Sequence, residues 1–382
     1  MLNSHRGLYI HIPFCIKKCR YCDFYSEPLA DSAYLESYTA ALLIEIEQQA
    51  EKFSAAQISS IFIGGGTPSL LTVQQLAKIF STIKKSFKLV DNIEISIEAN
   101  PAALELSWLE RIADIGINRL SIGVQSFADK ELKILGRAHN CQDIMESIEN
   151  LHSAGLTNFN IDLIYGIPGQ SLNDWQNNLQ RAVDCSPLHI SAYLLQLGND
   201  TPMAIDIEKG RLAMLDEDSE ALLYYKALEF LQEKGLMHYE ISNFCNRGFE
   251  CLHNLNYWQA GEYIGIGAGA VSYTNCRRYI NQVSWQEYIR NFRDKQNCVV
   301  EELEKMSAQE AIADAIILGL RLCRGINLHD YNIRFGTDIA NEYADSILSG
   351  IEKGLLKMEK GQLSLTKQGY FLSNEVLCQF IT

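Results

Sequence analysis

Short apolar segments alternate with longer amphipathic ones from Leu8 to Leu197. This alternation is typical of βα units packed around a parallel sheet. Six strands are predicted, at Leu8–Ile12, Ile58–Ile63, Ile93–Glu98, Arg119–Gln125, Asn158–Ile164 and His189–Leu195. Segments long enough to cross back over a sheet as helices include Ser32–Phe53, Thr72–Phe87 and Leu172–Val183. The pattern predicts an α/β fold, and both an open, partial (β/α)6 barrel of TIM type and a doubly wound sheet are compatible with it.

The pattern changes after the sixth predicted strand. Asp216–Lys234 is predicted to be a helix and Tyr239–Phe244 a strand. Farther on, Ser307–Leu322 and Thr337–Lys353 have helical periodicity, and Leu355–Leu365 has the pattern of a β-hairpin. Helices followed by a hairpin resemble a winged-helix module.

These changes divide the chain into three expected parts. A barrel would occupy residues 1–235, and a connecting segment residues 236–300. A smaller, mainly helical, winged-helix-like C-terminal domain would occupy residues 301–382.

Composition and charge narrow the classes of partner. The chain has 382 residues, of which 47% are hydrophobic, so it can bury a sizeable core. Its 33 basic and 47 acidic residues give a net charge of −14, which repels phosphate backbones and anionic lipid surfaces. No nucleic-acid partner is expected. Because the first residues lack a signal-peptide pattern and no apolar run reaches the roughly 18 residues of a membrane span, we expect a cytoplasmic protein.

Three of the eleven cysteines lie close together just after the first predicted strand, at Cys15, Cys19 and Cys22. Thiolates hold iron–sulfur clusters, and three thiolates leave one iron of a [4Fe–4S] cluster open for a chelating ligand. A structural zinc site is the alternative, but it needs four ligands, and His11 would have to be the fourth. We interpret the other cysteines as reduced structural thiols.

Polar and glycine residues follow several predicted strands. Gly64-Gly65-Gly66-Thr67 ends one strand, where glycines allow close approach of a ligand and leave amide groups free to bind it. Glu98, Gln125 and Asp162 lie at or near the ends of later strands, with Arg137 downstream. Because parallel strands end at one edge, these groups are expected to surround one polar ligand. Two other features are interpreted as structural: Gly265–Gly269 as a tight turn and His139 as an exposed loop residue.

Together these motifs resemble those of the oxygen-independent coproporphyrinogen III oxidase (HemN-like) family of the radical S-adenosylmethionine (SAM) superfamily. The resemblance rests on Leu8–Cys15 with Cys19 and Cys22, Gly64–Pro68, Glu98, Gly123–Phe127, Gly136-Arg137, Asp162–Gly166, Leu318–Leu322 and Gly325-Ile326. It implies a [4Fe–4S] cluster on the three cysteines. It also implies a SAM site formed by Tyr9, Gly65, Gly66, Thr67, Glu98, Gln125, Arg137 and Asp162. The glycines would meet the methionyl amino group, and the last four residues would meet polar and ribose groups.

One position departs from the oxidases, which carry a further cysteine where this chain has Phe24. They also have a longer segment ahead of the cluster than the fourteen residues that precede Cys15 here. Both features, and the run His253-Asn254-Leu255-Asn256-Tyr257-Trp258, resemble the HemW-type heme chaperone branch. This resemblance implies binding of heme, with His253, Tyr257 and Trp258 as candidates, and delivery of heme to apo-hemoproteins. Imidazole ligates heme iron, and Tyr and Trp offer flat apolar faces. Without the resemblance, His253 would be interpreted as a core histidine.

Enzymatic alternatives stay open. One is oxidative decarboxylation of the propionate side chains of coproporphyrinogen III, and the other is radical SAM chemistry on another tetrapyrrole. No catalytic residue is identified. Acceptor hemoproteins would include membrane-bound respiratory enzymes, and a homodimer is compatible with the sequence.

Overall fold

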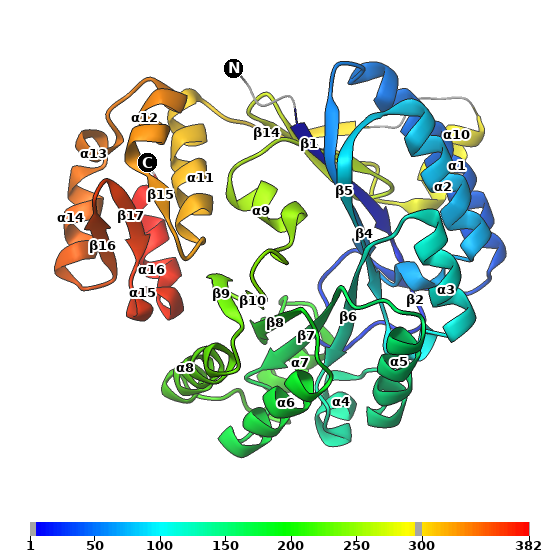
Figure 1. Ribbon diagram of the computed structural model, residues 1–382, viewed down its shortest axis with the longest axis horizontal. Helices are drawn as coiled ribbons and strands as arrows, with labels where there is room; N and C mark the ends of the chain where they lie inside the picture. The colour runs from blue at the N-terminus through cyan, green and yellow to red at the C-terminus, as the bar shows by residue number, and fades with distance from the viewer. Residues whose placement is uncertain (1–4, 295–299, 382) are drawn as a thin grey trace.

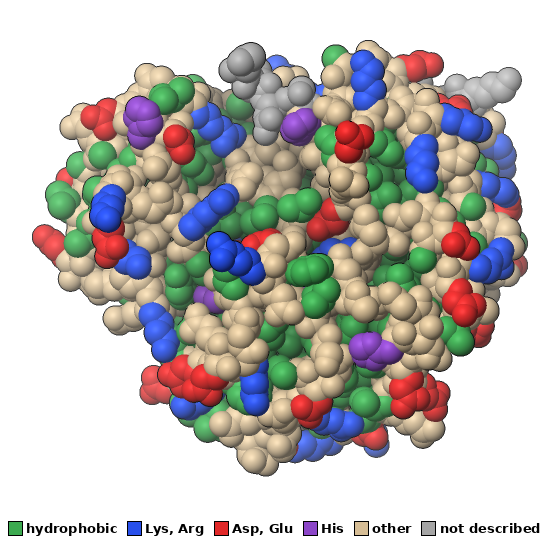
Figure 2. All heavy atoms as spheres, in the orientation of Figure 1, with side chains coloured by type: hydrophobic (Ala, Val, Ile, Leu, Met, Phe, Trp, Pro, Cys, Tyr) green, Lys and Arg blue, Asp and Glu red, His purple; other side chains and the backbone are tan. Residues whose placement is uncertain are grey.

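The computed structural model describes residues 5–294 and 300–381. Within them, one curved 12-stranded sheet carries the barrel, and the C-terminal helices form a module beside it (Figure 1). Basic and acidic side chains are interspersed over the face seen in Figure 2. No helix of the described chain is long and apolar enough to cross a membrane.

All six predicted barrel strands form, and they lie side by side in sequence order. They are β1 (His5–Ile12), β4 (Gln57–Gly65), β5 (Lys88–Ala99), β6 (Arg119–Gln125), β7 (Phe159–Tyr165) and β8 (His189–Leu194). Every neighbouring pair among them is parallel. A doubly wound sheet would reverse its strand order at a switch point. The unreversed order therefore confirms the partial barrel.

The sheet continues past both edges of these six strands. A seventh parallel strand, which the sequence pattern does not predict, pairs with β1 and leads into an antiparallel extension. These strands are β11 (Tyr263–Ile266), β12 (Val271–Thr274), β13 (Arg277–Asn281) and β14 (Val300–Lys305). The tight turn expected at Gly265–Gly269 connects β11 to β12.

At the other edge, the prediction of one strand over Tyr239–Phe244 is wrong. The segment forms a hairpin of β9 (Met237–Glu240) and β10 (Asn243–Cys245). The Glu240 carboxylate accepts a hydrogen bond of 3.2 Å from the Ser242 amide, which stabilises the turn between the two strands.

Helices cover the outer face of the barrel. They are α1 (Ala33–Lys52), α2 (Val73–Ser86), α3 (Leu106–Ile115), α4 (Asp129–Leu135), α5 (Cys141–Ser153), α6 (Leu172–Asp184), α7 (Pro202–Glu208), α8 (Glu217–Glu233) and α10 (Trp285–Arg293), with 3-10 turns η1 (Pro68–Leu70) and η2 (Pro101–Ala103). In α2, Leu76, Ile79, Phe80 and Ile83 are buried at helical spacing. Thr72 and Gln75 form a capping box at its start, so sequence determines both its boundary and its buried face.

The C-terminal module has a hydrophobic core of its own, which includes Ile316, Leu320 and Leu363. It contains α11 (Ala308–Leu320), β15 (Ile326–Asn327), α12 (Leu328–Phe335), α13 (Ile339–Glu342), α14 (Ala344–Glu352), β16 (Leu356–Glu359), β17 (Gln362–Leu365), α15 (Lys367–Phe371), α16 (Ser373–Leu377) and η3 (Cys378–Phe380). The hairpin forms as predicted. The single helix predicted over Thr337–Lys353 is instead two, because the backbone leaves helical geometry at Tyr343.

Helix α9 (Leu252–Trp258) lies between this module and the barrel strands (Figure 1). The Arg334 guanidinium donates hydrogen bonds of 2.8 Å to the carbonyls of Gln259 and Ala260, just after the helix. The Arg321 guanidinium stacks 4.7 Å from the centroid of the Trp258 ring. Two cations of the module therefore hold the carboxyl end of α9, where positive charge interacts favourably with the helix dipole.

We predict that Arg334→Ala loosens α9 without unfolding the barrel. The variant loses two charge-assisted hydrogen bonds at a largely exposed site, which should cost about 1 kcal/mol of unfolding free energy. Amide hydrogen exchange of residues 252–260 should accelerate. Arg324→Ala is the matched control, because the Arg324 side chain makes no hydrogen bond or ion pair with a described residue. Unchanged exchange in Arg334→Ala would contradict the prediction.

Candidate functional site

A cavity of about 570 Å³ opens at the carboxyl ends of the barrel strands. Its lining includes every residue expected at the cluster and SAM sites: Tyr9, Cys15, Cys19, Cys22, Gly65, Gly66, Thr67, Glu98, Gln125, Arg137 and Asp162. His253 and Tyr257 also line it, whereas Trp258 does not. Parallel strands that end at one edge bring these distant segments together.

The cysteine loop begins at β2 (Phe14–Cys15) and is closed by parallel pairing of β2 with β3 (Glu27–Pro28). Cys15 is buried, and Cys19 and Cys22 are partly exposed. The Arg137 guanidinium lies 3.2 Å from Cys19 Sγ. A cation therefore lies beside one of the three thiols that would ligate the cluster.

The thiols do not surround one point. Among the described residues, no three His, Cys, Asp or Glu side chains are placed to hold a single metal ion. His11, the fourth ligand that a zinc site would need, has both ring nitrogens occupied, at 3.0 Å from Tyr9 Oη and 2.9 Å from the Tyr25 carbonyl. Three thiols beside a cavity and a guanidinium therefore fit an iron–sulfur cluster, which spreads its ligands over several irons, better than a zinc ion.

The glycine loop after β4 packs directly against the start of the cysteine loop. A Cβ atom on Gly66 would lie 2.4 Å from the Phe14 carbonyl oxygen. The expectation that the loop's amides are free is wrong, because each donates within the chain. The Gly65 amide donates to Glu98 (2.9 Å), that of Gly66 to Ile12 (2.8 Å) and that of Thr67 to Phe14 (2.7 Å).

Two carboxyl groups face the cavity from neighbouring parts of the sheet, Glu98 on β5 and Asp162 on β7. Burial raises the pKa of Glu98 to about 7, and repulsion from Asp162 adds to this effect. Burial also raises the pKa of Asp162, although Asn160 and Ser121 donate hydrogen bonds to it. The cavity therefore holds two acids whose ionised forms would be stabilised by a ligand that donates hydrogen bonds or carries positive charge.

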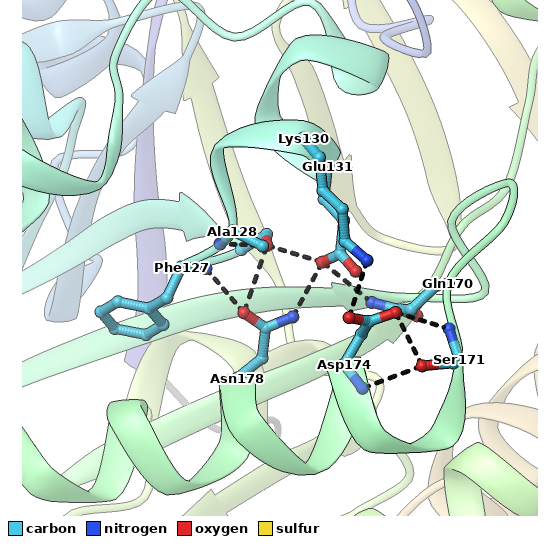
Figure 3. A network of polar contacts seen from close by, with 9 residues as sticks. Phe127, Ala128, Lys130, Glu131, Gln170, Ser171, Asp174 and Asn178 are labelled. Carbon is cyan, nitrogen blue, oxygen red and sulfur yellow. Dashed lines mark hydrogen bonds and ion pairs between the residues drawn. The ribbon is translucent and has the colours of Figure 1, made fainter.

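Gln125 ends β6 with a positive φ of 68°, a conformation that non-glycine residues rarely adopt. The loop after it is held by a buried polar network that joins α4 and α6 (Figure 3). Glu131 accepts from Ser126 (2.6 Å) and Asn178 (2.8 Å), while the Asn178 carbonyl oxygen accepts from the Phe127 amide (2.7 Å). This network stabilises the strained strand end that presents Gln125 to the cavity.

Polar residues deeper in the barrel are not among those predicted from the sequence. Asn160 and His189 lie below Asp162, and a hydrogen bond of 2.7 Å joins them. His189 continues to Tyr239 Oη at 2.8 Å. Polar residues at every second position, as in Asn160 and Asp162 or in His189 and Ser191, are the signal that marks a polar inner face.

The motif on α9 contributes two side chains to the cavity. His253 is buried, and its ring nitrogens lie 2.9 Å from Ser60 Oγ and 2.9 Å from Tyr257 Oη. Desolvation lowers the pKa of His253 to about 3, so the ring is neutral. In this conformation neither nitrogen is open to an iron atom. Trp258 points to the C-terminal module, where Arg321 stacks on it.

Two side chains near the cavity differ sharply in their solvent exposure. His139 is only 4% exposed, so the prediction of an exposed loop histidine is wrong. Its ring lies behind the end of β6, with nitrogens 3.2 Å from the Val124 carbonyl and 3.2 Å from Asn100 Oδ1. Phe24, in contrast, lines the cavity and is 67% exposed.

Comparisons with known proteins agree with this architecture. The family model of the radical SAM superfamily matches residues 9–182, and that of the HemN C-terminal domain matches residues 306–372. Among solved structures, coproporphyrinogen III oxidase (HemN) from Escherichia coli has a TM-score of 0.86 and 22% identity. The match covers 100% of this chain and 91% of that one, and it establishes the shared fold.

Curated relatives match over nearly the whole chain. The heme chaperone HemW of Lactococcus lactis subsp. lactis is 33% identical, over 100% of this chain and 98% of its own length. That of Bacillus subtilis is 33% identical over 98% and 99%, respectively. That of Buchnera aphidicola subsp. Schizaphis graminum is 36% identical over 98% of each. The chain therefore belongs to the HemW heme chaperone family, within the radical SAM superfamily.

Proposed function

We propose that this chain binds heme and delivers it to apo-hemoproteins, with a [4Fe–4S] cluster and SAM bound beside the heme. The observation that carries the proposal is the shared cavity. His253 and Tyr257 come from a helix far from the cysteine loop in sequence, yet they line the same cavity as the three thiols. A heme bound against α9 would therefore lie next to the cluster and SAM.

We assign the cluster to Cys15, Cys19 and Cys22, which leaves one iron open for SAM. When bound, such a cluster supplies the electron that cleaves SAM. The protein's own contribution is electrostatic and steric. Arg137 places a guanidinium beside Cys19 Sγ, and the pairing of buried β2 with exposed β3 fixes the loop.

We assign SAM to the strand-end groups of the cavity: Tyr9, Gly65, Gly66, Thr67, Glu98, Gln125, Arg137 and Asp162. Because the amides of the glycine loop are engaged, this loop would offer acceptor contacts to the methionyl ammonium. Glu98 and Asp162 would accept hydrogen bonds from polar and ribose groups of SAM. Such hydrogen bonds are stronger when the accepting carboxyl group is ionised.

For heme we assign Tyr257 the direct contact and His253 the position behind it. Both side chains line the cavity, but the two ring nitrogens of His253 are already hydrogen-bonded to Ser60 and Tyr257. His253 would reach iron only after it exchanged one of these bonds. Trp258 would act indirectly, through its packing against the C-terminal module.

Coproporphyrinogen III oxidation is the competing function, because the cavity keeps the groups that we assign to SAM. Phe24 counts against this function, because the oxidases carry a further cysteine at the position where this chain has an exposed phenylalanine ring. We place the carrier in the cytoplasm, with acceptors that include membrane-bound respiratory hemoproteins. A homodimer is compatible with the sequence, and sedimentation would test for it.

We predict that SAM affinity rises with pH through the region near 7. Glu98 is largely protonated below its raised pKa of about 7 and ionised above it, and only the ionised form accepts strongly from SAM. Glu98→Gln should lower the affinity by roughly tenfold and flatten this part of the profile. Equilibrium SAM binding to the anaerobically reconstituted protein tests this, with the exposed Glu105→Gln as control. A wild-type profile in Glu98→Gln would contradict it.

We predict that the reconstituted protein takes up heme anaerobically and passes it to an apo-hemoprotein. His253→Ala should bind heme more weakly, by roughly tenfold, because Tyr257 loses its hydrogen-bond partner. Heme titration and transfer are followed by absorbance, and coproporphyrinogen III is supplied in parallel with SAM and reductant. The porphyrinogen should survive. Its decarboxylation, in wild type and variant alike, would instead establish an oxidase.

A further inference from the structure

A second cavity of about 300 Å³, the side pocket, adjoins the main one. It is lined by Tyr9, His11, Phe24, Tyr25, Gly65, Glu98, Tyr257, Tyr263, Gly269 and Val271. Tyr9, Phe24, Gly65, Glu98 and Tyr257 also line the main cavity, so the two spaces share a wall. Each volume lies within or near the range of ~300–1,000 Å³ that is usual for ligand pockets.

The side pocket differs from the main cavity in chemistry, because most of its wall consists of rings. Tyr257 and Tyr263 meet edge to face, with centroids 4.6 Å apart at 81°. His11 and Tyr25 also line the pocket and stack, with centroids 6.1 Å apart at 21°. Glu98 is the single carboxylate in its lining. Aromatic walls of this kind suit a flat, largely apolar ligand.

Phe24 lies at the junction of the two cavities, and Lys18 lines the main one. Phe24 belongs to both linings and is 67% exposed, so protein packing does not account for its ring. Lys18 donates a hydrogen bond of 3.2 Å to the Phe24 carbonyl, which holds its ammonium group at the backbone of the same residue. An apolar face next to a cation matches a macrocycle that carries carboxylates on its edge.

Buried groups hold the far wall of the side pocket in place. Glu45 accepts from the Gly267 amide (2.8 Å), and Tyr38 Oη accepts from the Ala268 amide (2.8 Å). Gly269, next in the turn, leaves room for Tyr25, because a Cβ there would lie 2.9 Å from that ring. The wall is therefore formed before a ligand binds, which lowers the entropic cost of binding.

We propose that the side pocket receives part of the heme macrocycle, between the rings of Tyr257 and Tyr263 and those of Phe24 and Tyr25. The remainder of the macrocycle would extend past Gly65 toward the main cavity, and a propionate would meet Lys18. This inference rests on the proposed heme-carrier function and gives it a location. It would place heme and SAM on the two sides of the wall that Tyr9, Gly65 and Glu98 share between the cavities.

The test narrows the side pocket and measures two ligands separately. Val271→Trp places an indole in the lining of the side pocket, at a position that does not line the main cavity. Val300→Trp is the matched control, because Val300 is an exposed residue on strand β14 of the same sheet. Heme and SAM are titrated into each reconstituted protein, and circular dichroism with thermal unfolding checks the fold.

We expect Val271→Trp to weaken heme binding by about tenfold or more, with SAM affinity and the Val300→Trp control unchanged. Lys18→Ala should weaken binding of heme but not of its dimethyl ester, and it tests the proposal independently if Val271→Trp misfolds. Full heme affinity in folded Val271→Trp, or loss of SAM binding instead, would overturn the side-pocket assignment while leaving the carrier function standing. Absence of heme binding by the wild type would overturn both.

Discussion

The close contact between the glycine loop after β4 and the backbone that leads into the cysteine loop determines the rest of the site. Gly66 has no room for a side chain, since a Cβ would lie 2.4 Å from the Phe14 carbonyl oxygen. The Gly66 and Thr67 amides bond to Ile12 and Phe14 across this contact. Because the Gly65 amide also bonds to Glu98, one short turn links the cysteine loop to the acids at the strand ends. Any larger residue at Gly66 would separate the loop from the cavity.

The cavity is polar because the barrel has polar residues on its inner face, and these residues satisfy one another. Asp162, Asn160 and His189 form a hydrogen-bonded series that descends into the barrel. Buried polar groups are costly unless they are paired, so this series also restrains the strands that carry it. At its base, Glu94 accepts from the amides of Leu252 and His253 and so fixes the start of α9. The module holds the other end through Arg334.

Sequence periodicity predicts the six barrel strands and the convergence of Glu98, Gln125 and Asp162, because strand ends of a parallel sheet share one edge. It does not predict β11. This strand has only four residues, one of them Gly265, and its pairing with β1 depends on tertiary contacts. The sequence also does not show that the amides of Gly65–Thr67 already donate hydrogen bonds, or that both ring nitrogens of His253 already have partners. Both properties depend on which residue lies across a contact. The side pocket needs four segments that only folding brings together: residues 9–25, Gly65, Glu98 and residues 257–271.

We propose that heme, cluster and SAM occupy one continuous space between the barrel and α9. The most direct measurement uses the reduced, reconstituted protein loaded with manganese(II) protoporphyrin, a paramagnetic analogue of heme. Electron paramagnetic resonance would follow spin relaxation of the reduced cluster with and without the porphyrin. We expect faster relaxation when the porphyrin is bound, because a paramagnetic metal in the side pocket would lie close to the cysteine loop. Tight porphyrin binding with unchanged cluster relaxation would contradict it.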